Sequence, residues 1–392
     1  MKRVMPARSR RRARPRITPS ELRRLARRHG TPLLVIDCEA IRAQYSSLSA
    51  ALPGVALHYA LKPLPFGPVV AALRDLGSGF DVATTGEIAL VRAQGVAPER
   101  CIHTHPIKTD RDIAAALRFG IRTFVADNPD ELRKFARHAR RAEVLLRVSF
   151  RNPAAVVDLS RKFGCEPAAV LPLLEVARGL GVRVRGLSFH VGSQVADPTR
   201  FVEAIDACRE IMLEARAAGH SLDVLDIGGG FPVAYGGRLP GIREFCRPIR
   251  RELKSLPAGT RVIAEPGRYI AAAAGTCIAS VVGRAQREGR WWYYLDDGVY
   301  GSFSGQLYDH ALYPVDSLDR QGPRHPCVLA GPTCDSIDVI REDIPLPDLQ
   351  IGDLLSGRMM GAYTQATATD FNFIPRARMV AVNERGGRHR AD

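Results

Sequence analysis

One lysine, one histidine and one glycine triplet have the residue types that would bind a flat, phosphorylated aldehyde. Lys62 ends the apolar run Tyr59-Ala-Leu-Lys62, where desolvation can remove its proton and leave an amine that forms a Schiff base with an aldehyde. His190 stands between apolar residues, and its flat ring suits stacking on an aromatic ligand. Gly228-Gly229-Gly230 leaves backbone N–H groups free to bind a phosphate, and Arg268 could add charge, although such a turn can also simply reverse the chain. Together these residues predict a site for pyridoxal phosphate.

Further ionisable residues lie within or at the ends of apolar runs along the same stretch of chain. They are Asp81, His103, His105, Asp127, Arg147 and Glu265. Because buried charge is costly unless it is paired or used, this concentration indicates a functional site rather than packing. His103 and His105 have a spacing that also suits a metal, but two ligands without a third are weak support, so we expect no metal.

The elements that must position these residues follow a regular alternation of apolar runs and helix-patterned segments. The runs are Val55–Ala60, Gly79–Ala83, Cys101–His105, Thr123–Asp127, Val144–Ser149, Gly186–Val191, Val224–Ile227 and Val262–Glu265, and they predict a closed (β/α)8 TIM barrel of the α/β class. The intervening helical segments include Asp130–His138, Pro167–Gly179, Arg200–Ala218 and Gly241–Lys254. In such barrels the chemistry lies at the C-terminal ends of the strands. An open doubly wound sheet is the alternative, but the glycine fingerprint after its first strand is absent here.

A second domain of β type is predicted after residue 275, where helical periodicity fades. Strand-like runs separated by Gly, Pro and Asp turns are Thr276–Gln286, Arg290–Leu295, Cys327–Ala330, Leu354–Met359 and Met379–Asn383. The early run Leu33–Asp37 could pair with them. We therefore expect the barrel over residues 37–274, and a β-sandwich or β-barrel-like domain made of residues 29–36 with 275–392.

The net charge of +15 is concentrated at the N-terminus. Residues 1–28 carry +11 and the remaining chain only +4. The arginine run Arg8–Arg16 could form a nucleic-acid or membrane-surface arm, but no aromatic residue is interleaved with it for base stacking. A disordered, solvated tail over residues 1–28 is the favoured interpretation. We expect neither a nucleic-acid partner nor membrane association.

The compartment predicted from the sequence is the cytoplasm. The N-terminus is arginine-rich with no apolar run behind it, so no secretory leader is expected. The eight cysteines are scattered without a CxxC pair, which is typical of reduced thiols. Seven are interpreted as packing residues, and Cys334 is the exception.

Several motifs, read in order, resemble those of the PLP-dependent ornithine/diaminopimelate/arginine decarboxylase family, which has the alanine-racemase-like fold type. The resemblance runs from about residue 30 to 385 and is greatest to ornithine and lysine decarboxylases. In the barrel it rests on Tyr59-Ala-Leu-Lys62, Gly79-Phe-Asp81, Ser188-Phe-His190-Val-Gly-Ser-Gln194, Asp226-Ile-Gly-Gly-Gly-Phe-Pro232 and Glu265-Pro-Gly-Arg-Tyr269. In the second domain it rests on Asp297-Gly-Val-Tyr300-Gly-Ser-Phe303, Leu307-Tyr-Asp-His310, Gly331-Pro-Thr-Cys334-Asp-Ser336 and Gly361-Ala-Tyr363-Thr364.

The resemblance implies roles for the residues around the cofactor. Lys62 is expected to carry pyridoxal phosphate covalently, Glu265 to face its pyridine nitrogen, and His190 to stack on its ring. The remaining cofactor-binding residues are then Asp81, Arg147, Ser193, Gly229, Gly230, Gly267, Arg268 and Tyr363, with Lys162 at the rim. Cys334 is implied to return a proton to the α-carbon after CO2 leaves. In the family Cys334 and Asp335 reach the site of the other subunit, so a homodimer with shared active sites is implied.

The expected substrate is a small basic amino acid, most simply L-ornithine or L-lysine, which would give putrescine or cadaverine and CO2. The implied substrate-binding residues are Tyr300, Tyr308, Asp309 and Asp335, and two carboxylates there favour an ammonium group over a carboxylate. A diaminopimelate or other diamino-acid decarboxylase remains an alternative, and a racemase or a non-catalytic homologue acting as a regulatory decoy is less favoured. The chain departs from the family pattern at Pro63-Leu-Pro65, His103–Pro106 and Phe150–Asp158, which leaves the length and stereochemistry of the substrate open.

Overall fold

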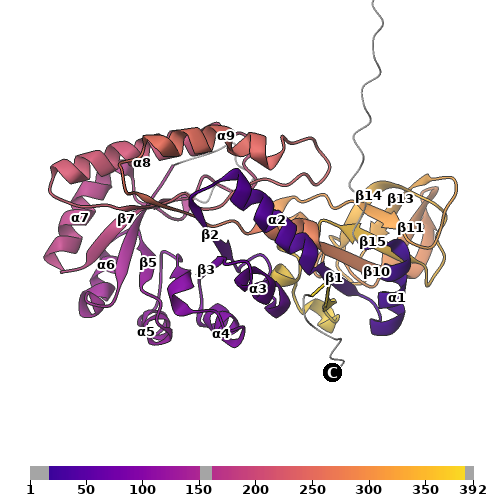
Figure 1. The fold of residues 1–392 in the computed structure, drawn as a ribbon. Coiled ribbons are helices and arrows are strands. Elements are labelled where there is room, and N and C mark those ends of the chain that lie inside the picture. Colours follow the sequence, from indigo (N-terminus) through magenta and orange to yellow (C-terminus); the bar gives the residue numbers. More distant parts are fainter. Residues whose placement is uncertain (1–16, 151–160, 385–392) are drawn as a thin grey trace, which may run out of the picture.

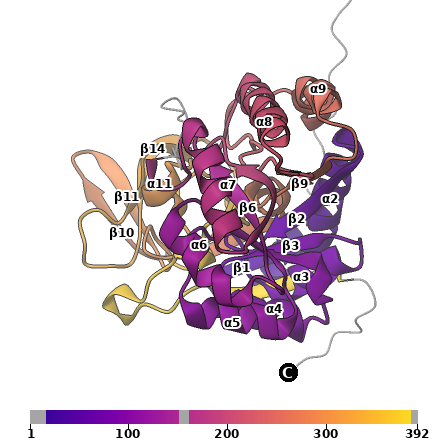
Figure 2. The same cartoon turned by 90° about the vertical axis from the view of Figure 1, so that its left-hand side faces the viewer.

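The structure is a computed structural model that describes residues 17–150 and 161–384 of the 392-residue chain. Eight parallel strands close into a barrel, as predicted, in the order β2 (Val55–Ala60), β3 (Gly79–Val82), β4 (Cys101–His103), β5 (Thr123–Ala126), β6 (Glu143–Val148), β7 (Arg183–Phe189), β8 (Val224–Asp226) and β9 (Arg261–Ala264). Val55 of β2 pairs with Val262 of β9, which closes the ring. Figures 1 and 2 show the helices packed around the outside of the barrel.

The helices around the barrel follow the predicted alternation with the strands. They are α2 (Cys38–Ala51), α3 (Gly67–Arg74), α4 (Thr85–Ala93), α5 (Asp110–Phe119), α6 (Pro129–Phe135), α7 (Val170–Gly179), α8 (Thr199–Ala217), α9 (Ile242–Glu252) and α10 (Arg268–Ala271). Inside the barrel, Ile102, Val125, Leu145, Val224 and Ile263 pack into a separate apolar cluster. Because this cluster fills the interior, the barrel is a packed scaffold whose polar residues gather at one end.

The second domain is a mixed, curled β-sheet at the right of Figure 1. Its described strands run in the order β12 (Val315–Ser317), β15 (Leu354–Arg358), β10 (Gly275–Arg287), β11 (Arg290–Leu295), β13 (His325–Ala330) and β14 (Val339–Leu346). The predicted early strand β1 (Leu33–Asp37) joins this sheet, antiparallel to β10 and parallel to β16 (Arg378–Val382). The sequence missed β12 and β14, because one is only three residues long and the other alternates around exposed charged residues.

The prediction of disorder over residues 1–28 is wrong for its second half. Pro19–His29 forms helix α1, which begins with a capping box between Thr18 and Glu21. Leu22 and Ala26 are buried against the β domain, so the arginines of this segment lie on the outer face of an amphipathic helix. The net charge of the segment does not reveal the four-residue spacing of Leu22 and Ala26, which is the signal for this helix. Residues 1–16 lie outside the described part of the chain.

The segment Phe150–Asp158, noted above for its departure from the family pattern, falls almost wholly outside the described residues. Among the helices that the structure does describe, none is both long and apolar enough to cross a membrane.

Candidate functional site

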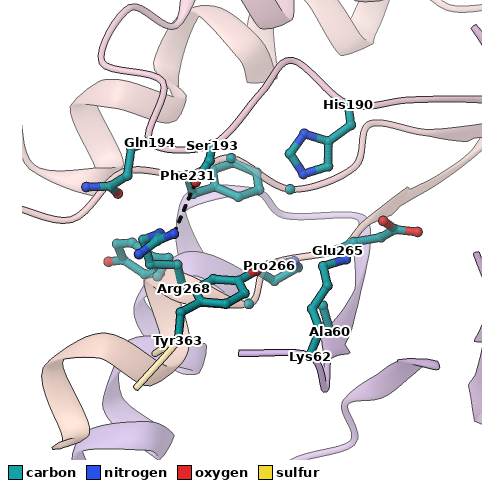
Figure 3. A pocket seen from close by; sticks show the side chains of 14 residues that line it. Ala60, Lys62, His190, Ser193, Gln194, Phe231, Glu265, Pro266, Arg268 and Tyr363 are labelled. Atoms are coloured by element: carbon teal, nitrogen blue, oxygen red, sulfur yellow. Dashed lines mark hydrogen bonds between the residues drawn. The ribbon is translucent and has the colours of Figure 1, made fainter. Parts of the chain in front are cut away.

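A cavity lies at the C-terminal ends of the barrel strands, where the sequence predicts the chemistry. It holds about 440 Å³ of space, part of it open to solvent. Nine of the residues predicted to bind the cofactor line it: Lys62, His190, Ser193, Gly229, Gly230, Glu265, Gly267, Arg268 and Tyr363. Figure 3 shows their side chains, with Arg268 and Tyr363 on one side of the cavity and Lys62 and Glu265 on the other.

Lys62 follows strand β2, and its side chain lines the cavity beside a buried carboxylate. Its Nζ lies 3.4 Å from Oδ2 of Asp81, which lies within strand β3. The other oxygen of Asp81 accepts a hydrogen bond from Thr104. Burial by itself lowers the pKa of Lys62, but attraction to Asp81, Tyr363 and Glu265 outweighs it, so the pKa is raised. Asp81 thus opposes the loss of the Lys62 proton, and the sequence could not show this because it does not place Asp81 beside the amine.

His190 follows strand β7 and presents a neutral ring to the cavity. Burial, together with the charges of Arg147 and Lys62, holds the pKa of His190 well below its usual value. The backbone N–H of Gly192 donates to Nδ1 over 3.1 Å, which leaves the ring proton on Nε2. A Cβ at Gly229 would stand 3.1 Å from that Nε2 and 2.7 Å from the Glu265 carbonyl oxygen. Glycine is thus required for the loop to pass under the ring.

Two buried carboxyl groups stand side by side at the end of strands β8 and β9. Burial and the neighbouring charges of Asp226 and Asp81 raise the pKa of Glu265 well above its ordinary value. Burial also raises the pKa of Asp226, to about 6. A side-chain hydrogen bond joins Glu265 to Asp226, so the two carboxyl groups can share one proton. A buried carboxyl pair, one member of which lines the cavity, fits a ligand with a ring nitrogen that binds a proton.

The opposite side of the cavity has the donors that a phosphate needs. Arg268 contacts three side chains there: it donates to Tyr235 over 2.9 Å and to Ser193 over 3.2 Å, and it pairs with Asp309. Its guanidinium lies 4.6 Å from the ring centre of Tyr363. Gly230 has φ +102°, and a Cβ there would come within 2.4 Å of the Gly192 carbonyl oxygen. The backbone therefore forms a glycine cradle beside a buried cation, as phosphate binding requires.

Arg147 and Lys162 lie near the site but do not line the cavity. Arg147 is on strand β6, and burial lowers the pKa of its guanidinium. Both cations lie against the ring of Phe163, at 5.5 Å for Arg147 and 5.0 Å for Lys162. They contribute positive charge near the rim, where Asp127 accepts a hydrogen bond from the backbone of Gly164.

The predicted substrate residues separate into two groups. Asp309, at the end of helix α11 (Gly305–Asp309), pairs with Arg268 near the cavity, whereas the neighbouring Tyr308 is 56% exposed. Tyr300 donates a hydrogen bond to Asp335 over 2.5 Å, which raises the pKa of Tyr300 to about 12 and lowers that of Asp335.

Cys334 and Asp335 lie outside the cavity within a single chain. Cys334 is exposed, and it hydrogen-bonds to Asn372. Within residues 17–150 and 161–384, no hydrogen bond or ion pair joins Tyr300, Cys334 or Asp335 to the residues that line the cavity.

Several cavity residues were not predicted from the sequence. They are Ala60, Gln194, Phe231, Pro266 and Tyr269, together with Asp226 and Tyr235 just behind the lining. Most of these lie within the quoted motifs, so their position next to Lys62, His190 or Glu265 was a usable signal. Tyr235 stands outside every motif and could be found only from the fold.

The two histidines that suggested a metal have different surroundings. His103 is fully buried and stacks on Phe124, with ring centres 5.8 Å apart. His105 instead meets the edge of Phe163. In the part of the chain that the structure describes, no group of three or more His, Cys, Asp or Glu residues could hold a metal ion.

Known proteins of similar sequence and structure are amino-acid decarboxylases. The lysine/ornithine decarboxylase of Selenomonas ruminantium is 38% identical over 358 residues, which are 91% of this chain and 91% of that protein. The ornithine decarboxylase of Mus musculus is 37% identical over 372 residues, 90% of this chain and 80% of that one. The crystal structure of lysine/ornithine decarboxylase from Vibrio vulnificus complexed with putrescine superposes with a TM-score of 0.90 at 51% identity, over 93% of this chain and 98% of that one.

The family model for the pyridoxal-binding domain of pyridoxal-dependent decarboxylases matches residues 38–272. This range begins with helix α2 and ends just after helix α10, so it covers the whole barrel. The match confirms the predicted cofactor class and agrees with the geometry of Lys62, Glu265 and Arg268 around one cavity. This chain is therefore a member of the pyridoxal-dependent decarboxylase family.

Proposed function

We propose that this enzyme decarboxylates L-ornithine or L-lysine, releasing CO2 and putrescine or cadaverine. The observation that carries the proposal is the cavity in which Lys62, the carboxyl of Glu265 and the buried Arg268 face one another. The choice of substrate is supported by the Vibrio vulnificus enzyme, whose structures are complexed with putrescine and with cadaverine.

The residues present fit pyridoxal phosphate, and each has a separate task. Lys62 would hold the aldehyde carbon, Glu265 and Asp226 the ring nitrogen, and His190 one face of the ring. The phosphate would be held by Arg268, Ser193, Tyr363 and the backbone of Gly229, Gly230 and Gly267. When bound, the cofactor supplies an electron sink for the pair of electrons left by CO2.

Protons in this site are controlled by the protein. The raised pKa of Glu265 means that a proton is available beside the ring nitrogen, and the neutral His190 adds no charge against the ring. The raised pKa of Lys62 means that the free site holds an ammonium, stabilised by Asp81, until the aldehyde arrives. Asp81 is thus the group that must release Lys62 when the covalent bond forms.

We further propose that the working enzyme is a homodimer in which Cys334 and Asp335 enter the partner's cavity. Both lie outside the cavity of their own chain, near the exposed Phe371, whose ring stacks on Tyr300. Asp335 has a lowered pKa and is ionised at neutral pH, so it can pair with the distal ammonium of a diamino acid. Asp309, the second carboxylate predicted to bind the substrate, pairs with Arg268 beside the cavity.

The proposed place of action is the cytoplasm, where the product diamines enter polyamine synthesis. All eight cysteines are free thiols, and seven of them are buried. Free thiols of this kind suit a reducing compartment.

The test of the activity is CO2 release by the protein loaded with pyridoxal phosphate. The panel contains L- and D-ornithine, L- and D-lysine, arginine, 2,4-diaminobutyrate and meso-diaminopimelate. Release from L-ornithine or L-lysine with Lys62→Ala inactive is the expected result. Release from meso-diaminopimelate alone would overturn the substrate assignment. Persistence of the imine absorbance in Lys62→Ala would overturn the role of Lys62.

Shared active sites can be tested by mixing two inactive variants. Lys62→Ala lacks the cofactor lysine and Cys334→Ala lacks the thiol, so only a mixed dimer contains one complete site. Random reassociation makes half of the dimers mixed, and about a quarter of the wild-type activity should return. If no activity returns although mixed dimers form, each chain uses its own Cys334.

A further inference from the structure

A short segment of the β domain, Asp370–Phe373, packs against the Cys334-Asp335 pair on one side. The ring of Phe371 stacks on Tyr300, with centres 4.5 Å apart and planes inclined by 19°, and Tyr300 donates to Asp335. Asn372 is the next residue, and its Oδ1 lies 3.2 Å from both the backbone nitrogen and Sγ of Cys334. Neighbouring residues of one segment therefore hold each member of the pair.

The segment itself is fixed at its base. Arg376 forms a two-pronged ion pair with Asp370, at 2.8 and 3.1 Å. The backbone N–H of Phe373 donates to the Asp370 carbonyl, which closes the turn. Asn372 has φ +55° and ψ 13°, the left-handed conformation that asparagine, aspartate and glycine tolerate best. The residue type and the backbone conformation thus agree.

The contact defines which atom of the asparagine faces Cys334. A backbone N–H can only donate a hydrogen bond, so the atom opposite it must be the amide oxygen. That oxygen accepts only, and it can accept from the thiol as well as from the N–H. A thiolate has no proton to donate and would be repelled by the same oxygen. The contact therefore fixes the Cys334 thiol against the amide oxygen of Asn372.

We propose that Asn372 is a positioning residue that holds the thiol of Cys334 in place for proton delivery. This inference rests on the proposed function, in which CO2 departs and leaves the electron pair of the broken bond at the α-carbon. That pair takes the proton from Sγ of Cys334, forming a C–H bond and a thiolate, which recovers a proton from water. Asn372 acts on the reaction only through Cys334.

Two substitutions distinguish the effect of losing the amide oxygen from the effect of changing the backbone conformation of the segment. Asn372→Gly keeps the left-handed backbone and removes the acceptor, whereas Asn372→Asp keeps an oxygen in place and adds negative charge. The readout is the rate of alkylation of Cys334 by iodoacetamide in the loaded enzyme, measured across neutral and alkaline pH. The other seven cysteines are buried, and Cys334→Ala provides the background rate.

Near neutral pH, Cys334 should be alkylated about fivefold faster in Asn372→Gly than in wild type. Its alkylation in Asn372→Asp should be no faster than in wild type. Asn372→Gly that reacts at the wild-type rate would overturn the proposal. So would an equal acceleration in both variants, because that would indicate a loosened segment rather than a lost acceptor.

The second readout is the ratio of diamine formed to CO2 released. In wild type one diamine forms for each CO2, whereas misdirected protonation in Asn372→Gly should bring the ratio below that of Asn372→Asp. A ratio unchanged in Asn372→Gly would overturn the link to proton delivery. If no substrate of the panel releases CO2 while the alkylation order holds, the proposed function fails and the positioning of Cys334 by Asn372 stands.

Discussion

Arg268 and Asp309 form an ion pair that joins the barrel to the β domain directly beside the cavity. Nη2 of Arg268 lies 2.9 Å from Oδ2 of Asp309, and the side chains are only 6% and 12% exposed. Burial opposes the charge on Arg268, but Tyr235 and Asp309 outweigh it and raise its pKa. The group proposed to bind phosphate is thus held in place, before any ligand arrives, by a carboxylate proposed to face the substrate.

Removing that carboxylate should weaken the cofactor-free protein more than the loaded one. Asp309→Asn leaves Arg268 buried without its counter-charge, at a cost of about 3–5 kcal/mol in the free energy of unfolding. Bound phosphate would supply the missing charge and reduce this loss. Urea unfolding with and without pyridoxal phosphate measures both values. Asp130→Asn, which breaks an exposed pair with Arg133, is the control and should change stability by less than about 1 kcal/mol. Equal losses with and without cofactor would argue against a shared role for Arg268.

Asp81 should control the pH at which Lys62 captures the cofactor. Burial lowers the pKa of Lys62 and attraction to Asp81 is the first influence that raises it. Asp81→Asn therefore lowers the pKa of Lys62, and covalent capture of pyridoxal phosphate should begin at a pH lower by about one unit or more. Stopped-flow absorbance across a pH series follows the imine directly. Thr104→Val keeps the Asp81 charge while removing its hydrogen bond, so it should shift the onset much less. An unshifted onset in Asp81→Asn would contradict this reading of the ion pair.

Acid should destabilise the protein through two buried histidines. Burial lowers the pKa of His58 and of His103 to about 4, against an ordinary value of 6.5. Both are neutral in the folded protein, so their stabilisation is complete above about pH 6.5 and is lost as the pH falls toward about 4. Each contributes a slope of roughly 1.4 kcal/mol per pH unit in that window.

The substitution His103→Leu isolates one of these slopes. Neither ring nitrogen of His103 has a hydrogen-bond partner among the described residues, so little is lost with the ring beyond its contact with Phe124. The free energy of unfolding of His103→Leu should fall less steeply than that of wild type between about pH 6.5 and 4. The difference in slope should correspond to one titrating proton. Denaturant titrations at several pH values test it. A slope equal to that of wild type would mean that His103 titrates normally in the fold.

Asp335 should determine the preference for a charged side chain in the substrate. Asp335→Asn removes a negative charge from the proposed distal end of the site, and kcat/KM for lysine or ornithine should fall roughly 100-fold. Norleucine lacks the distal ammonium, so it should be turned over much more slowly than lysine. Its kcat/KM should change little between wild type and Asp335→Asn. The ratio of the two kcat/KM values separates lost recognition from general damage. A parallel fall for both substrates would assign Asp335 to the chemistry instead.

The local features of this protein were determined by its sequence alone. Strand and helix periodicities are properties of neighbouring residues, so the eight barrel strands and helices such as α8 were predicted within a few positions. The cofactor motifs were readable for the same reason, since Lys62, His190 and Glu265 each follow a strand. Barrel closure then brings the strand ends together, and this placed nine predicted residues around one cavity.

Only the tertiary structure decided how residues from distant segments influence one another. Asp226 raises the pKa of Glu265, Asp309 pairs with Arg268, and Asn372 accepts from Cys334, across separations of 38 to 41 residues. The raised pKa of Lys62 and the docking of helix α1 onto the β domain have the same origin. Burial and charge act through space, and the distances that set their strength exist only once the chain has folded.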